Sequence, residues 1–395
     1  MVQIIDFKDH IGESVQTQGW VMNKRSGKGL EFIILRDGSG FAQCIVDQEV
    51  VGDEFFETAK RLSQESSVEL SGEIVKDEKQ IGGYELHVKE IKQLGESVDY
   101  PISNKEHGIE FLMDHRHLWL RSKRQWAILK VRNRIIMAIH AFFQKEGFVQ
   151  TDSPIFTGNA AEGSTTLFSS QFYDQDAYLA QTGQLYGEAM AMAMGKIYTF
   201  GPTFRAEKSK TRRHLSEFWM IEPEMAFFDN EKNMDLIEAF IKFVIVDVLD
   251  HCKEELEILE RDTAVFENIA KKDFPRLTYD EAVKIIKGET KMNGKTTIDI
   301  LEESLAEVKK NIEENKKGIE EREKEIAGGV KKGKRNFLQN KIDQLKNEIS
   351  ELEKKEKNIP QWIDSAKNFT YGNDFGGSDE TAITQMFDVP VMVYN

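Results

Sequence analysis

Four charged side chains lie within or beside two otherwise apolar segments of FGPTFRAEKSKTRRHLSEFWMIEPEMAF, which begins at Phe200. Arg205 and Glu207 follow the first apolar segment, and Glu222 and Glu224 interrupt the second. An arginine binds a phosphate or a carboxylate through two parallel hydrogen bonds, and a glutamate accepts hydrogen bonds from amines. These side chains therefore suit ligands with phosphate, carboxylate and amine groups, such as a nucleotide together with a zwitterion.

The spacing of these residues predicts two antiparallel strands joined by the basic loop KSKTRRHLS. Side chains alternate between the faces of a strand, so residues two apart share a face. One common surface would then hold Thr203, Arg205 and Glu207 from the first strand and Phe218, Met220, Glu222 and Glu224 from the second. Phe218 would offer a flat ring to a base. The alternative is a network of ion pairs within the sheet, but buried ion pairs are costly unless every partner is satisfied.

Length, charge and cysteine content limit the classes of protein to which the chain can belong. Its 395 residues suffice for two or three domains, and its net charge of −15 argues against a surface that binds nucleic acid everywhere, although a local basic patch remains compatible. Cys44 and Cys252 lack nearby His or Cys partners, which argues against a disulfide framework or a zinc site. No signal peptide is evident, and Lys242 and Asp247 interrupt the most apolar run. We therefore expect a cytoplasmic protein that does not enter a membrane.

Short strand-like runs alternate with glycine-containing turns between residues 15 and 95. Three strands, a helix in GDEFFETAKRLS and two further strands follow the order of a five-stranded OB-fold barrel. Barrels of this kind bind oligonucleotides. The alternative is a small β-barrel with a structural role.

Longer mixed segments follow from Pro101 onward. RQWAILKVRNRIIMAIHAFFQKEGF predicts an amphipathic helix that ends before Gly147. Its apolar positions with helical spacing are Ile128, Val131, Ile135, Ala138, Ile139 and Phe142. FVQTDSPIFT predicts a strand, and Pro154 places it at an edge or an interface because proline cannot donate a ladder hydrogen bond.

Residues 298–359 have a heptad pattern on both sides of the glycine-containing segment GGVKKGKRN. The apolar positions are Ile298, Leu301, Leu305, Val308, Ile312, Ile319 and Ile326 before it, and Leu338, Ile342, Leu345, Ile349, Leu352 and Ile359 after it. This pattern predicts an antiparallel coiled-coil hairpin. Its basic tip, residues 331–335, suits either contact with nucleic acid or a solvated turn. The sequence leaves the role of the hairpin open.

The segments FRAE, RHLSEF and MIEPE, with the basic loop between them, resemble motif 2 of the class II aminoacyl-tRNA synthetases. The predicted helix and the strand with Pro154 are similar to motif 1, the dimer interface of that family. The barrel resembles the anticodon-binding domain of the aspartyl, asparaginyl and lysyl members. The resemblance implies an α+β fold with an OB-fold domain at 1–100, a hinge at 101–120, and an antiparallel-sheet catalytic domain at 121–395 that is interrupted by the hairpin at 298–359. It also implies a homodimer with Pro154 at its interface.

Within this family, the segment from QTGQLYG to MIEPE resembles the asparaginyl enzymes most. Aspartyl enzymes have a lysine at the position of Gly187, where it neutralises the substrate carboxylate, and an aspartate at the position of Glu222. A glutamate can accept from the NH2 group of asparagine and repels the carboxylate of aspartate. The resemblance therefore implies ATP-dependent charging of tRNA(Asn) with asparagine. A relaxed enzyme that charges both amino acids, or an amidating paralogue, are alternatives, although such paralogues usually lack the barrel.

The resemblance also implies the residues of the active site. Glu162 and Gln184 would bind the amino acid, with Glu162 on its ammonium group. Arg205 would bridge the amino acid carboxylate and the α-phosphate of ATP, and Glu222 would contact the amide. The remaining ATP contacts would come from Glu207 on the adenine amino group, Phe218 on the ring, and Arg213 and His214 on the outer phosphates. The reaction needs positioning and charge neutralisation, normally with Mg2+, rather than a protein nucleophile.

The barrel segment KRSGKGLEFIILRDGSGFAQ resembles the anticodon reader of the same family. The resemblance implies that Phe32 stacks on an anticodon base, that Gln43 hydrogen-bonds a base edge and that Arg25 contacts the strand. Outside the resemblance, Phe32 would be an ordinary aromatic residue of a sheet.

One part of the family pattern is absent from the sequence. The third motif, a glycine-rich strand and a helix with an arginine for the γ-phosphate, is not found, and GGSDE at Gly376 lacks that arginine. The acidic metal ligands of the family are expected downstream of Asn395. We therefore expect a C-terminally incomplete synthetase that is inactive or nearly inactive by itself. Half of a split enzyme, or a truncated relative that binds tRNA without catalysis, are the alternatives.

Overall fold

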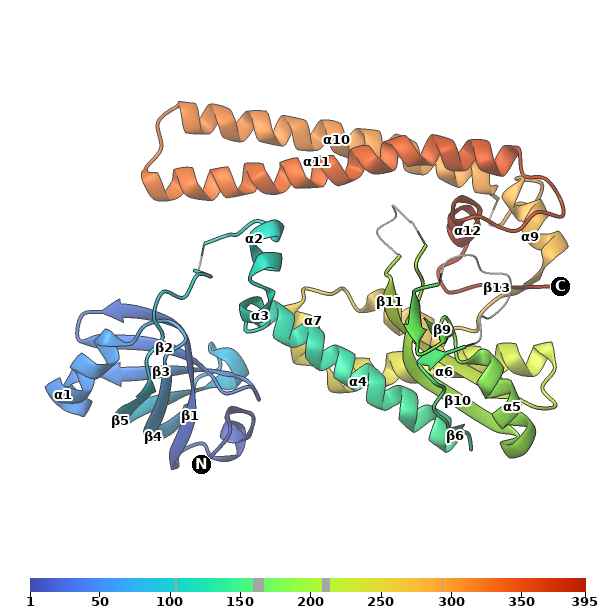
Figure 1. Ribbon diagram of the computed structural model, residues 1–395. Helices are drawn as coiled ribbons and strands as arrows, with labels where there is room; N and C mark the ends of the chain where they lie inside the picture. Colours follow the sequence, from blue (N-terminus) through green and yellow to red (C-terminus); the bar gives the residue numbers. More distant parts are fainter. Residues whose placement is uncertain (104, 159–166, 208–213, 293) are drawn as a thin grey trace. The chain divides into compact units, whose positions relative to one another are not determined.

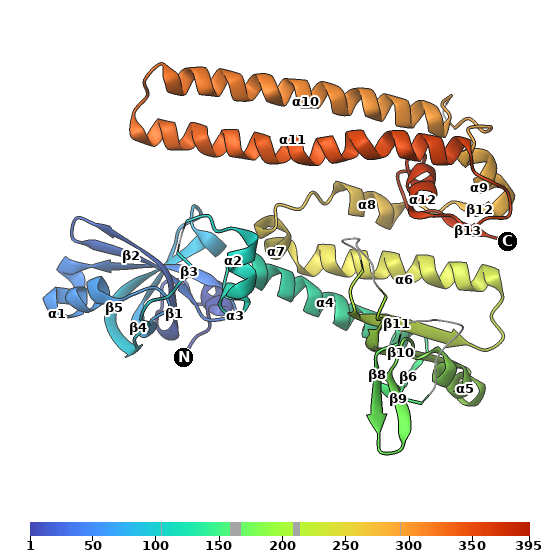
Figure 2. The ribbon, with the colours of Figure 1, turned by 45° about the horizontal axis from the view of Figure 1, so that its top comes forward.

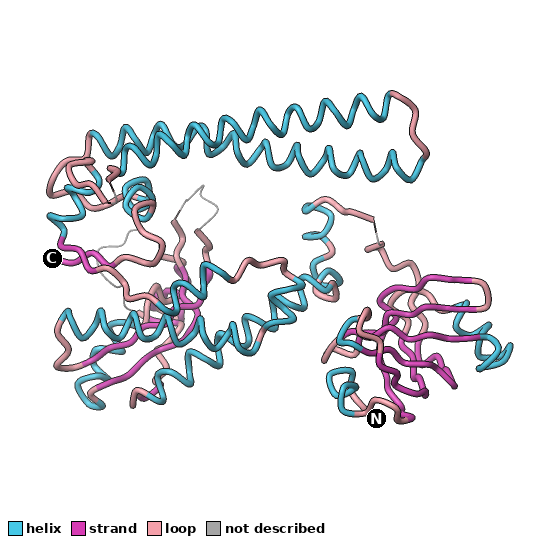
Figure 3. Tube along the Cα trace, turned by 180° about the vertical axis from the view of Figure 1, so that it is seen from behind, coloured by secondary structure: helices cyan, strands magenta, loops and turns pink. Residues whose placement is uncertain are grey.

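The computed structural model describes residues 1–103, 105–158, 167–207, 214–292 and 294–395. These residues form two compact units, Met1–Gln125 and Trp126–Asn395 (Figure 1). Among them, no helix has the length and apolar character that crossing a bilayer requires. Strands are concentrated in the barrel and in a smaller group of sheets in the second unit (Figure 3).

The first unit is a closed five-stranded barrel, as the order of its sequence segments predicts. Its elements are β1 (Ser14–Gly27), β2 (Leu30–Arg36), β3 (Phe41–Asp47), α1 (Gln48–Arg61), β4 (Ser67–Lys76) and β5 (Tyr84–Gly95), with short 3-10 turns η1 (Ile4–Asp9) and η2 (Ile81–Gly83). The strand order is β1-β2-β3-β5-β4, and β4 pairs with β1 to close the barrel. Alternate side chains of each strand fill the interior, which is why the core is rich in Ile, Leu and Val.

Gly72 permits the close approach of β4 and β5. A Cβ at this position would lie 2.2 Å from the carbonyl oxygen of His87, and the strand register shifts between Ser71 and Gly72. Only glycine lets two backbones come so close, so this residue allows the irregularity at which the barrel curves.

After the barrel come α2 (Ile109–Asp114) and α3 (Arg116–Trp119), and a buried ion-pair network ties the barrel to Arg121, two residues past α3. The carboxylate of Glu65 accepts from Arg36 at 2.8 Å and from Arg121 at 3.0 Å. Arg36 also donates to the backbone carbonyl of Arg121 at 2.8 Å. Both Arg36 and Glu65 are buried, so each charge depends on the others for compensation.

The second unit is built around a sheet of the order β11-β10-β6. Its strands are β6 (Val149–Gln150), β10 (Lys196–Phe204) and β11 (Glu217–Met225), and its flanking helices are α4 (Lys123–Lys145) and α6 (Asn230–His251). β10 and β11 are antiparallel, whereas β6 runs parallel to β10. The predicted helix before Gly147 is confirmed as α4, and Gly147 adopts a positive φ of 76° just after it.

The prediction of one strand through Pro154 was wrong. Two short strands, β6 and β7 (Phe156–Thr157), flank an exposed connection that contains Pro154. Thr151 donates its backbone N–H to Tyr198 at 3.0 Å, after which the chain leaves β10. Proline lacks the N–H that a continued strand would need, so the connection is where the ladder stops.

Smaller elements complete the second unit. They are β8 (Ser169–Phe172) and β9 (Gln175–Leu179), which form a sheet with β7, then α5 (Gln184–Met194), α7 (Lys253–Ile258), α8 (Ala264–Lys271), β12 (Arg276–Thr278), α9 (Tyr279–Ile286), α12 (Gly377–Thr384) and β13 (Met392–Tyr394). β12 and β13 pair in parallel, although their residues lie more than 100 positions apart in the sequence.

Two long antiparallel helices, α10 (Thr297–Ala327) and α11 (Lys332–Lys367), form the helical hairpin of the second unit (Figure 2). Leu301, Val308, Ile312 and Ile349, all of the heptad pattern, lie in one buried cluster between them. The second helix continues past Ile359 through Pro360, because its later residues pack against α12 at the base of the hairpin. At the tip, Lys334 forms an ion pair with Glu325 at 2.5 Å.

Candidate active site

The β10–β11 hairpin has one apolar face and one face with polar and charged side chains. Tyr198, Phe200 and Ile221 belong to the apolar face, which packs in a cluster with residues of α4 and α6. Cross-strand pairing places Thr203 opposite Phe218, Thr199 opposite Glu222 and Ile197 opposite Glu224 on the other face. α4 and α6 cover the apolar face and α5 packs beside Glu224 on the other, so the Arg205 end of the polar face is the part most open to a ligand.

Arg205 and Phe218 lie together at the loop end of this face. β10 ends at Phe204, and the backbone N–H of Arg205 donates to Ser216 at 3.0 Å, which continues the pairing by one residue. The guanidinium carbon of Arg205 is 5.4 Å from the centre of the Phe218 ring, within cation–π range. Glu207 is exposed beyond the strand, so the predicted strand extends further than the observed one. A cation and an aromatic ring thus form one end of the site.

Glu222 is held by three hydrogen-bond donors from two other segments. Its Oε1 accepts from the hydroxyl of Thr182, and its Oε2 accepts from the backbone N–H of Gly183 at 2.9 Å and from the hydroxyl of Thr199 at 3.3 Å. Sequence reasoning missed Thr182, Gly183 and Thr199. The only available signal was that Thr199 and Thr203 interrupt an apolar strand, which indicates polar partners on one face.

Gln184 begins α5, directly after the residues that bind Glu222. Its side-chain amide donates to Glu188 at 2.9 Å, one helical turn later. Gly187, on the same helix, lies against Glu224 rather than Glu222, because a Cβ at Gly187 would be 3.1 Å from the Cγ atom of Glu224. Burial, followed by the charges of Glu188 and Glu222, raises the pKa of the Glu224 carboxyl. Three carboxylates therefore gather along α5 and β11.

A cavity of about 250 Å³ lies beside Glu222. Polar lining residues are Thr151, Asp152, Ser153, Thr182, Thr199, Thr203 and Glu222, and apolar ones include Ile155, Phe200 and Trp219. The hydroxyl oxygen of Thr151 is buried and has no hydrogen-bond partner among the described residues. The cavity has room for a small polar group next to the carboxylate of Glu222.

Some candidate residues contribute little or nothing to the described geometry. Glu162 and Arg213 lie outside the described residues, and His214 is exposed at the loop end of β11. Among the residues that the structure describes, no three His, Cys, Asp or Glu side chains are grouped as metal ligands.

The three candidate RNA-binding residues of the barrel lie on one outer face. Arg25 is the cross-strand partner of Phe32, with its guanidinium 4.9 Å from the ring centre. Gln43 donates to Glu85 at 3.1 Å, and His87 contacts the other oxygen of Glu85 at 2.8 Å. Sequence reasoning missed Glu85, which alternation along β5 could have placed on this face. Aromatic, cationic and amide groups together can contact bases and phosphates.

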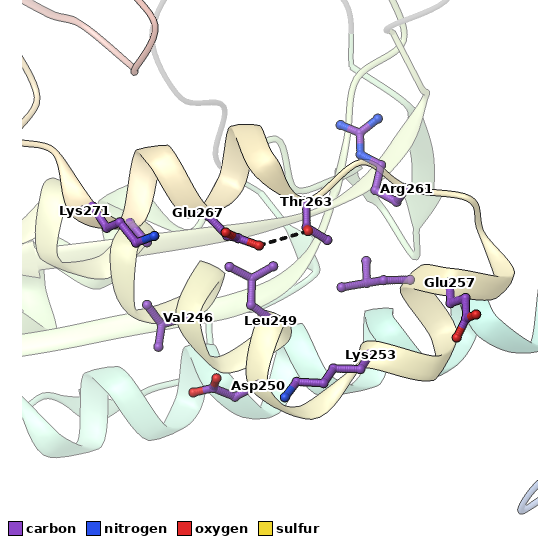
Figure 4. Close-up of a pocket in the computed structure, with 11 residues that line it drawn as sticks. Val246, Leu249, Asp250, Lys253, Glu257, Arg261, Thr263, Glu267 and Lys271 are labelled. Atoms are coloured by element: carbon purple, nitrogen blue, oxygen red, sulfur yellow. Dashed lines mark hydrogen bonds between the residues drawn. The ribbon is translucent and has the colours of Figure 1, made fainter. Parts of the chain in front are cut away.

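A larger cavity, of about 700 Å³, lies among α6, α7 and α8 (Figure 4). Acidic and basic side chains alternate around it, among them Asp250, Lys253, Glu267 and Lys271 (Figure 4). Thr263 donates to Glu267 at 3.1 Å across one turn of α8. None of the residues expected to bind ATP, an amino acid or RNA lines this cavity.

Comparison with protein families matches both units of the chain. Residues 108–388 match the family of tRNA synthetases class II (D, K and N), and residues 15–94 match the OB-fold nucleic acid binding domain. The first match covers more than half of the chain, and the second covers the barrel.

Solved structures give the same relationship. An asparaginyl-tRNA synthetase from Pyrococcus horikoshii, complexed with asparaginyl-adenylate, is 30% identical with a TM-score of 0.73, over 100% of this chain and 74% of its own. The asparaginyl-tRNA synthetase of Entamoeba histolytica, also with asparaginyl-adenylate, is 28% identical with a TM-score of 0.59, over 70% of this chain and 63% of its own. An aspartyl-tRNA synthetase from Entamoeba histolytica, 22% identical with a TM-score of 0.58 over 76% of this chain and 66% of its own, shares the fold.

Proposed function

The chain belongs to the class II tRNA synthetases of the D, K and N group, and on that premise we propose that its second unit holds the site at which asparagine is activated with ATP for transfer to tRNA(Asn). The observation that supports this most is the polar face of the β10–β11 hairpin. Arg205, Phe218 and Glu222 lie there on one surface, with the cavity of about 250 Å³ beside Glu222. A cation, a ring and an oriented acceptor are the groups that an aminoacyl-adenylate requires.

In the proposed reaction, a carboxylate oxygen of the amino acid attacks the α-phosphorus of ATP. The new O–P bond replaces the bond to pyrophosphate, which leaves with its electron pair. Arg205 neutralises the carboxylate and the α-phosphate, so that two anions can approach. Phe218 stacks on adenine, Glu207 accepts from its amino group, and Arg213 and His214 contact the outer phosphates. The protein accelerates the step by positioning and charge neutralisation.

The proposed specificity rests on the chemistry of Glu222. Its carboxylate accepts from the side-chain amide of asparagine and repels the carboxylate of aspartate. In this proposal Gln184, at the start of α5, turns its side chain from Glu188 to the amino acid, and Glu162 binds the ammonium group. Gly187 adds no cation that would attract an acidic substrate. The surface that contains Glu222 already includes Glu224, whose charge adds to the repulsion of aspartate.

Mg2+ would accompany ATP and shield its phosphates. The described residues gather no set of ligands for this ion, and the roles proposed for Arg205 and Phe218 do not depend on it.

For tRNA binding, we propose the barrel face with Arg25, Phe32 and Gln43. Phe32 stacks on an unpaired anticodon base, Gln43 contacts a base edge, and Arg25 contacts the phosphates. Glu85 orients the amide of Gln43 through their 3.1 Å hydrogen bond. The anticodon distinguishes one tRNA from another, so this face selects the tRNA, whereas the surface around Glu222 selects the amino acid.

We further propose that two copies of the chain form a homodimer. Supporting it, apolar residues of the α4 surface, of the connection between β6 and β7 and of β11 are exposed, among them Ile128, Leu129, Met137, Pro154, Ile155 and Trp219. Exposed apolar groups of this density favour a protein partner. Light scattering after size exclusion measures the mass directly. A monomer at a protein concentration of about 10–50 μM would contradict the dimer.

The function is tested by ligand binding and by turnover. Isothermal titration with non-hydrolysable sulfamoyl analogues of asparaginyl- and aspartyl-adenylate measures the two affinities, and ATP–pyrophosphate exchange with each amino acid measures activation. We expect the asparaginyl analogue to bind at least about 100-fold more tightly, as expected when a buried acceptor must pair with a donor. Equal affinities would instead identify a relaxed enzyme, and tRNA binding without binding of either analogue would identify a tRNA-binding protein without catalysis.

A further inference from the structure

The hydrogen bonds around Glu222 have directions that the structure defines. The hydroxyl of Thr182 accepts from the backbone N–H of Gln184 at 3.1 Å, so its own hydrogen is available for the Oε1 atom of Glu222. The backbone N–H of Gly183 can only donate, and it donates to Oε2 at 2.9 Å. The two residues that precede α5 thus present two donors to one carboxylate.

The two oxygens of Glu222 are used unequally. A carboxylate oxygen has about two acceptor directions. Both directions of Oε2 are taken, by Gly183 and Thr199, whereas Oε1 accepts only from Thr182 among the described residues. One acceptor direction of Oε1 therefore remains for a ligand, and it suits one N–H of a primary amide.

Packing prevents the Gly183 N–H from moving away. Gly183 is buried, and a Cβ there would lie 2.8 Å from the hydroxyl oxygen of Ser153, 3.0 Å from that of Thr199 and 3.2 Å from Oε2 of Glu222. Ser153 also donates to the carbonyl of Gly183 at 3.2 Å. The site therefore requires a residue without a side chain at this position.

We propose that Thr182 and the backbone N–H of Gly183 are positioning residues that determine specificity, because they orient Glu222 as the acceptor for the amide of the substrate. This inference rests on the proposed function. Without these donors the carboxylate can rotate and place its free acceptor direction in solvent. A substrate amide then loses its hydrogen-bond acceptor and binds less tightly. The affinity for a substrate carboxylate, which Glu222 repels, does not fall.

The test compares two substitutions at one position in the full 395-residue chain. Thr182→Val removes the hydroxyl but keeps the shape, and Thr182→Ser keeps the hydroxyl. Affinities for the asparaginyl and aspartyl sulfamoyl analogues are measured by titration, and melting curves show that each variant is folded. We expect Thr182→Val to lower the asparaginyl-to-aspartyl affinity ratio about tenfold, the effect of losing one oriented hydrogen bond to a charged group. Thr182→Ser should keep the ratio within about twofold.

A second variant tests the Gly183 contact. Gly183→Ala keeps the N–H but places a Cβ against Glu222, so the ratio should again fall. Gly333→Ala is the control and should leave the ratio unchanged, because Gly333 is exposed at the start of α11 and has open space for a Cβ.

The outcomes separate the inference from the proposed function. If the unmodified chain prefers the asparaginyl analogue and Thr182→Val leaves the ratio unchanged, or weakens both analogues equally, the positioning role is wrong while the function stands. If the unmodified chain binds neither analogue, or has no preference, the proposed specificity fails and the positioning role fails with it.

Discussion

Gly187 of α5 lies against Glu224 of β11, with a Cβ at position 187 only 3.1 Å from the Cγ atom of Glu224. No side chain at position 187 separates the helix from this glutamate. Glu188, the next residue on α5, and Glu222, two residues earlier on β11, both raise the pKa of Glu224 by their charge, after burial as the main cause. The repulsion among these like charges therefore destabilises the folded protein, which indicates that the charges serve binding rather than folding.

Glu224→Gln should stabilise the protein at neutral pH. A raised pKa in the folded state means that the protonated carboxyl favours folding at low pH, and this contribution is lost as the pH rises through the folded pKa. Glutamine is neutral throughout, so the gain should be absent at about pH 4 and reach about 2 °C in melting temperature at pH 7. Melting curves at several pH values measure it. A gain that is independent of pH would contradict the electrostatic explanation.

Phe218→Leu should weaken ATP binding about tenfold, because it removes the aromatic surface beneath adenine but keeps an apolar side chain. Arg205→Lys should weaken it by a similar factor, since lysine keeps the charge and loses the two-pronged hydrogen bond. Titration with a non-hydrolysable ATP analogue measures both. Phe227→Leu is the control, because Phe227 is 97% exposed just after β11. Equal losses in all three variants would show that the effect is not specific to the site.

Substitutions on the barrel face should separate stacking from charge. Arg25→Gln and Phe32→Leu should each reduce tRNA affinity about tenfold. Only Arg25→Gln should also lower the dependence of log affinity on log salt, by about 0.7 for one phosphate contact to a single strand. Filter binding at several salt concentrations measures both values. If Phe32→Leu changed the salt dependence as much as Arg25→Gln, the assignment of roles would be wrong.

Glu65→Gln should destabilise the first unit by about 3 kcal/mol, because Arg36 would remain buried without its full counter-charge. Urea denaturation monitored by far-UV circular dichroism measures the loss. Glu57→Gln removes an exposed ion pair with Lys60 on α1 and should leave the stability almost unchanged, because solvent screens this pair. Similar losses in the two variants would show that burial of the Glu65 network contributes nothing.

Both cysteines should be unreactive in the folded protein. Cys44 and Cys252 are buried, and burial is the main cause that raises the pKa of each thiol. Since the thiolate is the nucleophile, labelling by a thiol reagent at pH 8 should be at least about 100-fold slower than in denaturant. Rapid labelling of either thiol in native buffer would contradict the buried location.

The spacing of apolar side chains was sufficient to predict the elements whose structure depends on residues close together in the sequence. The barrel order between residues 15 and 95 is confirmed, because alternation and turn residues specify each strand separately. The helix before Gly147 is confirmed for the same reason, although Ile128 of its apolar stripe is 38% exposed rather than in the core. The strand through Pro154 was wrong, because a short apolar run does not reveal where a ladder partner ends.

The charged face of the hairpin followed from its own two strands, whose residues are neighbours through a single turn. From the sequence alone, alternation put Phe218 and Glu222 on one face, and the composition of that face indicated a nucleotide and an amino acid. The partners of Glu222 could not be read in this way. Thr182 lies 40 positions away in the sequence, and Gly183 contributes a backbone N–H that every residue except proline has. Which distant segment meets a strand is decided by packing of the whole unit, so only the tertiary structure could identify the donors that orient this carboxylate.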